Sequence, residues 1–216
     1  VVGTDFEVTS YSNNTDVSTD DAKASVTLTG KGNYKGTRTI EFNITKGCLK
    51  TLYDNGDVTI DAIDKQTFTR SAIEPSVVIK RDGTALASTN YALSYANNIC
   101  VGNATVTITG ADNYADTEAC ALETAFTIEQ APLSLTANNV SVVYGHNFSE
   151  AATQGYTPDG FISPDDAATL IDGVTYTSDY TTTTNAGEYA GYNKIDVVTP
   201  KANSDCTQSL SNYEVT

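Results

Sequence analysis

The chain holds a single histidine, His146, and this residue limits the catalytic chemistry open to it. A histidine base needs a serine or cysteine held beside it and a third group that orients the ring. His146 follows Tyr144-Gly145 in a predicted turn, and no nucleophile elbow or activated cysteine pattern surrounds it. The sequence therefore predicts a loop histidine, and we expect the chain not to be an enzyme.

Neighbouring carboxylates are the other residues with the chemistry for acid–base catalysis, as in glycosidases. The nearest pairs are Asp20-Asp21, Asp54 with Asp57, and Asp165-Asp166, and all lie in polar segments. The chain contains no Trp, the residue that commonly forms a platform for sugar rings. These acids are predicted to be solvated loop residues rather than a catalytic pair.

A calcium loop is the metal site that the acidic residues indicate most directly. Asp54-Asn55-Gly56-Asp57 matches the opening of such a loop, and Asp61 is close enough in sequence to add an oxygen ligand. The closing Glu is missing, because Lys65 stands at its position. Asp54, Asp57 and Asp61 are thus candidate ligands of a structural calcium ion, although an ordinary acidic turn is the favoured interpretation. No other cofactor is indicated.

The four cysteines indicate disulfides rather than a metal site. No Cys-x-x-Cys spacing occurs, and one histidine cannot complete a tetrahedral zinc site. We predict a Cys100–Cys120 disulfide, because both residues flank one expected hairpin turning at 111–113, with residues 118–123 absorbing the difference in register. The rival pairing joins Cys48 to Cys100 or Cys120. If Cys100 pairs with Cys120, Cys48 and Cys206 are left unpaired or bond elsewhere in the full protein.

The composition excludes several partners. Twelve basic and 27 acidic residues give a formal charge of −15, which repels nucleic-acid phosphates and anionic lipid. No apolar run is long enough to cross a bilayer, so we expect no membrane insertion. Gly30-Lys31-Gly32 lies between two predicted strands and precedes no helix, so it is not a phosphate loop.

The even cysteine count and acidity favour a secreted or cell-surface protein, and both ends look cut from a longer chain.

A repeat organises the first 130 residues. Residues 10–14, 26–30, 33–34 and 42–44 match residues 94–98, 106–110, 113–114 and 126–128 in the same order, with an offset near 80 residues. Ala104 to Thr109 alternates apolar and hydroxyl residues, which predicts a strand with one buried face. The Asn-Asn before each such strand predicts a tight turn.

The repeat predicts an all-β fold of tandem modules arranged end to end. Residues 1–46 are the C-terminal part of one module, which we expect strands from upstream or from another chain to complete. Residues 47–130 form a complete module, and residues 131–216 form a third module that is cut short. Strands are expected at 58–60, 67–69, 76–80 and 91–95, with a hairpin turn at 80–83 and a short helical turn near Ser163-Pro164.

The second module resembles the immunoglobulin-like repeats of large bacterial surface proteins. The matching residues are Ala72-Ile73-Glu74-Pro75, Tyr91, Tyr95-Ala96-Asn97-Asn98, Gly102, Ala104 to Gly110, Asn113-Tyr114 and Phe126-Thr127-Ile128. The match covers most of 47–130 and departs from the pattern at Cys100 and at 118–123. It implies a β-sandwich.

The third module is similar to the Tyr-Gly-type (MBG-like) modules of haemagglutinin-type adhesins, which would be β-grasp-like. The matching residues are Leu135-Thr136-Ala137, Val143-Tyr144-Gly145, Gly160-Phe161, Asn185-Ala186-Gly187-Glu188-Tyr189 and Asn212-Tyr213. His146 stands where an acidic residue commonly follows in that family.

Together the resemblances imply the non-catalytic repeat region of a bacterial adhesin, acting as a stalk and binding surface. Its partners would be the neighbouring modules and an unknown extracellular protein or glycan. The alternative is an accessory carbohydrate- or protein-binding region of a secreted multidomain enzyme, with the loop from Tyr176 to Tyr192 as the ligand surface.

Overall fold

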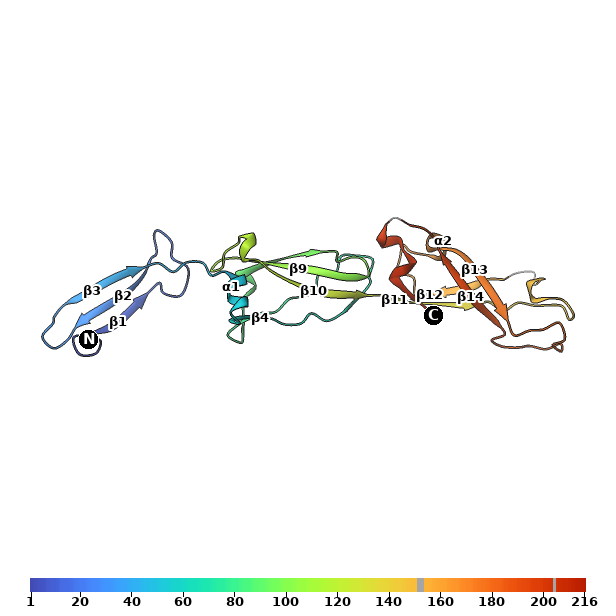
Figure 1. Ribbon diagram of the computed structural model, residues 1–216, viewed down its shortest axis with the longest axis horizontal. Helices are drawn as coiled ribbons and strands as arrows, with labels where there is room; N and C mark the ends of the chain where they lie inside the picture. The colour runs from blue at the N-terminus through green and yellow to red at the C-terminus, as the bar shows by residue number, and fades with distance from the viewer. Residues whose placement is uncertain (151–153, 204) are drawn as a thin grey trace. The chain divides into compact units, whose positions relative to one another are not determined.

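The computed structural model describes residues 1–150, 154–203 and 205–216 (Figure 1). The chain is mostly β, with 41% of residues in strands and 11% in helices, which confirms the β-rich class. Among the described residues, no helix has the length and apolar character that crossing a bilayer requires.

Contacts divide the chain into two compact units. The first comprises 1–62, 76–94 and 106–124, and the second comprises 63–75, 95–105 and 125–216. Each described sheet nevertheless lies within one of the predicted ranges 1–46, 47–130 and 131–216. The module boundaries themselves stay a prediction.

The N-terminal sheet has the order β1-β2-β3, with β1 at Phe6–Ser12, β2 at Ala24–Gly30 and β3 at Thr37–Phe42. The middle sheet has the order β5-β10-β9-β8, with β5 at Gln66–Thr67, β8 at Tyr91–Ala96, β9 at Gly102–Gly110 and β10 at Leu122–Glu129. The matched sequence segments therefore place β1, β2 and β3 in correspondence with β8, β9 and β10.

Turn geometry repeats along with the strands. Asn13 and Asn97 both adopt positive φ, at 49° and 56°, as the tight-turn prediction requires. Gly30 and Gly110 end β2 and β9, and a Cβ on either would lie within 3 Å of atoms of the following turn, at Tyr34 and Tyr114 respectively. Each glycine thus lets the Asn-Tyr turn fold back closely against the strand.

A β-bulge gives the N-terminal sheet one apolar face. Val8 pairs with Leu28, but Tyr11 pairs with Val26, so one residue between them is extra. Without this bulge, Tyr11 would point to the opposite face from Val8. The apolar residues of this face are Phe6, Val8, Tyr11, Ala24, Val26, Leu28, Ile40 and Phe42, and Arg38, opposite Leu28, lies at its margin. We call it the Val26 face.

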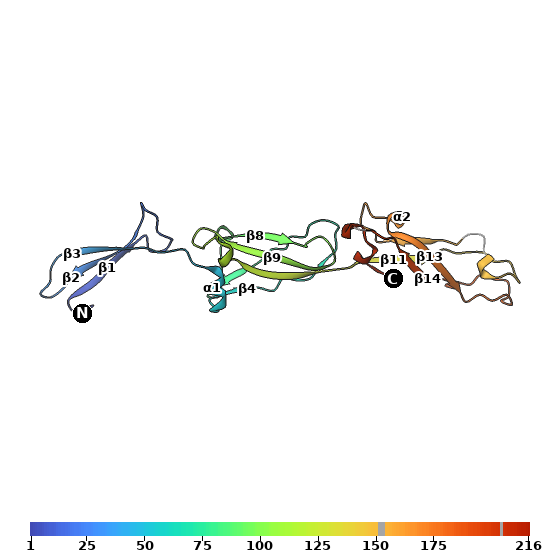
Figure 2. The ribbon, with the colours of Figure 1, turned by 45° about the horizontal axis from the view of Figure 1, so that its top comes forward.

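The Val26 face is only partly covered: Ala24 is buried, but four of its eight apolar side chains are exposed. Tyr11 is 57% exposed and Phe42 is 39% exposed. Val106 and Phe126, which match Val26 and Phe42 in the second copy, are 0% and 3% exposed. Figure 2 shows β1-β2-β3 as a single layer. The second copy has a further sheet, β4-β6-β7, formed by Val58–Ile60, Ile79–Arg81 and Thr84–Ala85, with Val58 and Ile79 fully buried.

We expect the double variant Val26→Thr/Ile40→Thr to reduce both binding of the dye ANS and self-association of the chain. An apolar face of this kind binds apolar dyes and associates in water, and hydroxyls on its central rows weaken both effects. Dye fluorescence and sedimentation velocity provide the measurement. The control, Thr27→Ser/Thr39→Ser on the opposite face, should change neither. Equal dye binding by wild type and the Val26 face variant would contradict the expectation.

The strands of residues 47–130 follow the sequence predictions unevenly. The predicted strands 58–60 and 91–95 are confirmed, but the one at 76–80 begins only at Ile79, and that at 67–69 is replaced by β5. The hairpin turn is confirmed: Asp82 and Gly83 join β6 to β7 with φ of 51° and 78°. α1 spans Leu49–Asp54, and single 3₁₀ turns occupy Ser88–Asn90 and Glu118–Cys120.

Residues 131–216 build two sheets and a short helix. β11 (Ala131–Ala137) pairs antiparallel with β12 (Tyr156–Asp159) and parallel with β15 (Tyr213–Val215). β13 (Ile171–Ser178) pairs antiparallel with β14 (Asn193–Pro200). α2 spans Ala167–Leu170, and 3₁₀ turns lie at Phe148–Glu150, Cys206–Gln208 and Leu210–Asn212.

The predicted helical turn near Ser163 exists, but it starts later. Asp166, rather than Ser163, caps α2 in a capping box with Thr169. Pro164 lies before the helix and not at its first position.

The predicted Cys100–Cys120 disulfide is wrong. The structure pairs Cys48 with Cys120 and Cys100 with Cys206, with Cα–Cα distances of 4.9 and 6.0 Å. The hairpin connection runs from the end of β9 at Gly110 to the start of β10 at Leu122, which is much longer than the turn at 111–113. Cys100 precedes the nine-residue β9, whereas Cys120 follows it, so the two cysteines lie at opposite ends of that strand. At roughly 3.3 Å per residue this separation is far beyond the reach of a disulfide.

We expect non-reducing peptide mapping to recover one cross-linked peptide with Cys48 and Cys120 and another with Cys100 and Cys206. The disulfides close loops with sequence separations of 72 and 106 residues. In the chain-entropy model each destabilises the unfolded state by about 4 to 5 kcal/mol. A peptide joining Cys100 to Cys120 would contradict this pairing.

Candidate functional site

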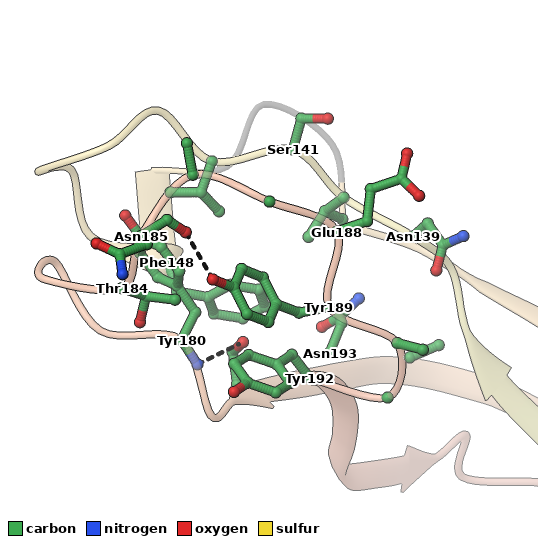
Figure 3. Close-up of a pocket in the computed structure, with 18 of the residues that line it drawn as sticks. Asn139, Ser141, Phe148, Tyr180, Thr184, Asn185, Glu188, Tyr189, Tyr192 and Asn193 are labelled. Carbon is green, nitrogen blue, oxygen red and sulfur yellow. Dashed lines mark hydrogen bonds between the residues drawn. The ribbon is translucent and has the colours of Figure 1, made fainter.

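A pocket of about 810 Å³ lies at the end of the β13–β14 hairpin (Figure 3). Its walls come from the segment 138–148, which follows β11, and from the loop 179–192, which joins β13 to β14. The base of this loop is fixed by the strand pairing of Ser178 with Asn193 and by a 3.1 Å hydrogen bond from Asp179 N to Tyr192 O. Regular strands therefore hold loops that would otherwise be free to move.

A stacked pair of tyrosines forms one wall of the pocket. The rings of Tyr189 and Tyr192 lie with centroids 4.8 Å apart and an interplanar angle of 29°. The Tyr189 hydroxyl donates a 2.9 Å hydrogen bond to Asn185 O, which fixes the ring in place (Figure 3). Tyr189 remains 41% exposed, so its ring is both ordered and accessible.

Two hydrogen bonds join the walls of the pocket. The Tyr180 hydroxyl donates to Val143 O at 3.4 Å, and Asn193 Nδ2 donates to Asn138 O at 2.6 Å. Asn193 Oδ1 is buried and receives no hydrogen bond from the described residues. Leaving a buried acceptor without a hydrogen bond costs roughly 1–3 kcal/mol.

The lining of the pocket is polar but almost uncharged. Glu188 is the one charged residue among the described lining residues. The other polar side chains are amides and hydroxyls that both donate and accept hydrogen bonds: Thr136, Asn139, Ser141, Tyr144, Ser178, Tyr180, Thr184, Asn185, Tyr189, Tyr192 and Asn193. The site is thus equipped to bind a neutral, polar ligand that also presents an apolar face.

Only some of the residues in the sequence motifs of the third module line this pocket. Tyr144 and the segment 185–189 line it, as do Tyr180 and Tyr192 of the loop predicted as a ligand surface. Tyr176 does not; it lies on β13, where burial raises its pKa. Asn139 and Phe148 were missed, since no pattern around them distinguishes them from other loop residues. His146 is exposed in the Tyr144 turn and is not part of the lining.

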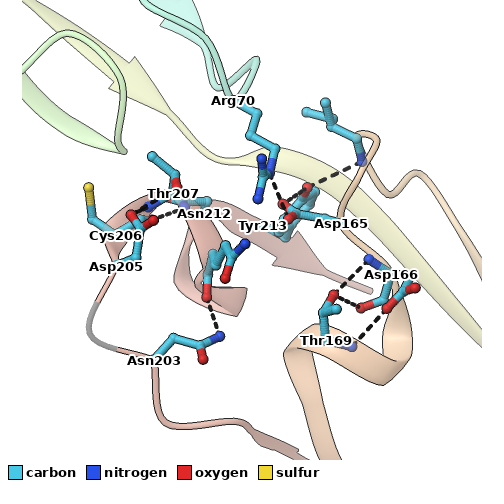
Figure 4. Close-up of polar contacts among 12 residues, drawn as sticks. Arg70, Asp165, Asp166, Thr169, Asn203, Asp205, Cys206, Thr207, Asn212 and Tyr213 are labelled. Carbon is cyan, nitrogen blue, oxygen red and sulfur yellow. Dashed lines mark hydrogen bonds and ion pairs between the residues drawn. The ribbon is translucent and has the colours of Figure 1, made fainter.

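A second cluster of polar contacts lies where 47–130 meets 131–216, within the second compact unit (Figure 4). Arg70 Nε donates to Asp165 Oδ1 at 2.7 Å, and the Tyr213 hydroxyl donates to Asp165 Oδ2 at 2.7 Å. The Asp165 side chain is only 1% exposed. The Tyr213 ring makes edge contacts with Phe68 and Phe161, with centroids 5.7 and 5.6 Å apart.

Asp165 and Asp166 therefore have two different structural roles. Asp165 is a buried partner of Arg70 and Tyr213. Asp166 accepts from Thr169 N as the helix cap, and this bond and the Thr169 hydroxyl lower its pKa. Asp20, Asp21 and Asp57 lie exposed, as predicted for loop acids.

The calcium candidates are not gathered into a site. Asp54 pairs with Lys50 at 2.5 Å and Asp61 pairs with Lys80 at 2.6 Å. Within the described ranges, no group of three or more His, Cys, Asp or Glu residues could hold a metal ion. A lysine beside two of the three carboxylates opposes the positive charge of calcium.

Neither a protein-family model, nor a curated protein, nor a solved structure matches this chain.

We expect the free energy of unfolding to fall as pH rises above about 10, in part because of Tyr213. Burial, followed by the hydrogen bond to Asp165, raises the pKa of Tyr213 to about 12. The unfolded chain releases this proton near pH 10, while the folded chain keeps it, so the stabilisation is complete below pH 10 and is lost as pH rises toward 12. Urea unfolding at pH 8, 9, 10 and 11 provides the measurement.

The control for this experiment is Tyr213→Phe. It should be less stable at pH 8, by roughly 1–3 kcal/mol, because Asp165 Oδ2 loses its donor. Its stability should then decline less steeply between pH 9 and pH 11 than that of the wild type. Parallel declines in the two proteins would show that Tyr213 does not carry the effect.

Proposed function

We propose that this chain is a non-catalytic region of a secreted or cell-surface bacterial adhesin, in which tandem β modules form a load-bearing scaffold that presents a binding pocket. The observation that carries the proposal is the Cys100–Cys206 disulfide, which adds a second covalent link, besides the backbone, between residues 47–130 and residues 131–216. A scaffold under load needs junctions that do not open.

Non-covalent contacts strengthen the same junction. Val101 N donates to Asn212 Oδ1 at 3.2 Å, and Gln130 Nε2 donates to the carbonyls of Ser211 and Tyr213 at 3.0 and 3.1 Å. Together with the Arg70–Asp165 pair, they fix the start of β11 and β15 on both sides. A flexible linker would have none of these contacts.

The junction between 1–46 and 47–130 is also held by specific contacts. Asn113 Nδ2 donates to Asp16 Oδ1 at 2.9 Å, and Asn113 Oδ1 accepts from Val17 N at 2.8 Å. Asn113 O also accepts from Gly47 N at 2.9 Å. One asparagine of the repeated Asn-Tyr turn thus serves two neighbouring segments, as expected where each module contacts mainly its neighbours.

The two disulfides support placement outside the cell, since disulfides persist in oxidising compartments. The formal charge of −15 suits an exposed, soluble surface. We interpret the sheets as immunoglobulin-like in 47–130 and β-grasp-like in 131–216, in line with the family resemblances.

The second candidate function is an accessory carbohydrate- or protein-binding region of a secreted enzyme. The pocket lined by Tyr180, Tyr189 and Tyr192 favours it, because aromatic, polar pockets of this size are typical ligand sites. Both functions are non-catalytic for this part of the chain and differ in what the parent protein carries.

The scaffold function is tested by pulling the chain by its ends with optical tweezers. With the disulfides intact, the loops they close cannot extend. Reduction should therefore lengthen the fully stretched chain by at least the 106-residue separation of Cys100 and Cys206, or about 350 Å at roughly 3.3 Å per residue.

Equal extension of the oxidised and reduced chains would contradict a load-bearing role for the junction. Hydrolysis of a glycan or peptide substrate that disappears in the His146→Ala variant would contradict the non-catalytic assignment.

A further inference from the structure

The ring of Tyr189 is a preformed platform at the mouth of the pocket. Its position is fixed by stacking on Tyr192 and by the hydrogen bond to Asn185 O, and its exposure of 41% leaves part of the ring accessible. The face of an aromatic ring carries partial negative charge and attracts partly positive C–H groups. A sugar ring presents such C–H groups on its flat faces. Because the platform is ordered without a ligand, binding loses little side-chain entropy there.

The charge of the pocket excludes anionic ligands. Phosphate, sulfate and carboxylate groups are bound in proteins by Arg, Lys or backbone amides with positive charge nearby. No Lys or Arg is among the described lining residues, and Glu188 adds a negative charge. The net charge of −15 repels anions further. The ligand is therefore neutral or carries a positive charge.

The hydrogen-bonding groups of the lining favour sugar hydroxyls over a proline-rich peptide. Asn139 and Ser141 can each donate and accept hydrogen bonds, whereas the carboxylate of Glu188 only accepts. A sugar hydroxyl matches both kinds of group, because it also donates and accepts. A proline-rich peptide, the other ligand that binds aromatic-lined grooves, lacks N–H groups at proline and presents mainly carbonyl acceptors toward Glu188.

We propose that the pocket between 138–148 and 179–192 binds a neutral oligosaccharide, with one sugar ring stacked on Tyr189 and the sugar hydroxyls bonded to Asn139, Ser141 and Glu188. The volume of about 810 Å³ lies within the range of ~300–1,000 Å³ that is usual for ligand sites. This assignment deepens the binding role proposed above. It depends on the proposed function in one respect only, namely that the pocket meets its ligand outside the cell.

The test is binding of the oxidised 216-residue chain to an array of immobilised oligosaccharides, followed by calorimetry with the best neutral binder. The array contains neutral hexose and N-acetylhexosamine oligomers, sialylated and sulfated glycans, and a proline-rich peptide. We expect binding to one class of neutral oligosaccharide.

Three substitutions separate stacking from other effects. Tyr189→Ala removes the platform and should weaken binding about tenfold, equivalent to about 1.4 kcal/mol. Tyr189→Phe keeps the ring and loses only the hydroxyl bond to Asn185, so it should retain most of the affinity. Tyr53→Ala, on α1 in the other compact unit, removes a tyrosine of similar exposure (45%) and should leave binding unchanged. Circular dichroism melting curves check that each variant is folded.

Several results would overturn the proposal: no neutral oligosaccharide bound at millimolar concentration, preference for the anionic glycans or the proline-rich peptide, or equal affinity of wild type and folded Tyr189→Ala. None of these results would change the extension measured in optical tweezers, so failure of the ligand assignment is distinguishable from failure of the scaffold function.

Discussion

The buried carboxylate of Asp165 is the constraint on which the arrangement of residues 131–216 depends. With a side chain only 1% exposed, it must keep both Arg70 and Tyr213 as partners. Removing one partner of a buried ion pair typically costs about 3–5 kcal/mol, because the remaining charge stays out of water. Arg70 adopts a positive φ of 65°, so the backbone accepts an uncommon conformation to place this guanidinium. Tyr213 in turn brings Phe68 and Phe161 together around its ring.

The position of the pocket follows from this constraint through β11. The first residues of β11 pair with β15, beginning with Ala131 opposite Tyr213. The strand then runs seven residues to Ala137, where the segment 138–148 leaves it to form one wall of the pocket. Buried Leu133 and Leu135 hold the strand against the core between these ends. A strand fixed at one end by the Asp165 cluster thus delivers the pocket wall at its other end.

Local chemistry could be predicted from the sequence, whereas distant pairings could not. The positive φ of Asn13, Asn97 and Asp82 follows from turn residues whose conformation depends on their immediate neighbours. The pairing of Cys100 with Cys206 spans 106 residues, and the Arg70–Asp165 pair spans 95. No spacing rule connects residues this far apart, so the prediction fell on the nearer cysteine, Cys120. The tyrosines of the candidate site were identifiable by their density, but Asn138 and Asn193, 55 residues apart, are brought into hydrogen bonding only by the fold.

A comparison of the two copies of the repeat shows which structural features a strand pattern determines and which it does not. Val26 and Val106 occupy matching positions with the same alternation, yet Val106 is fully buried and Val26 lies on a face where Tyr11 and Phe42 remain well exposed. Alternation therefore specifies which side chains share a face, and the bulge before Tyr11 even corrects the register to keep that face apolar. It does not specify what covers the face, because burial depends on residues outside the strand. The same reasoning applies to the Asn-Tyr turns: Tyr114 is 4% exposed in the turn whose Asn113 bonds to Asp16 and Gly47, whereas Tyr34 in the matching turn is 62% exposed. In a tandem array, each copy of a motif acquires its role from the neighbour that packs against it.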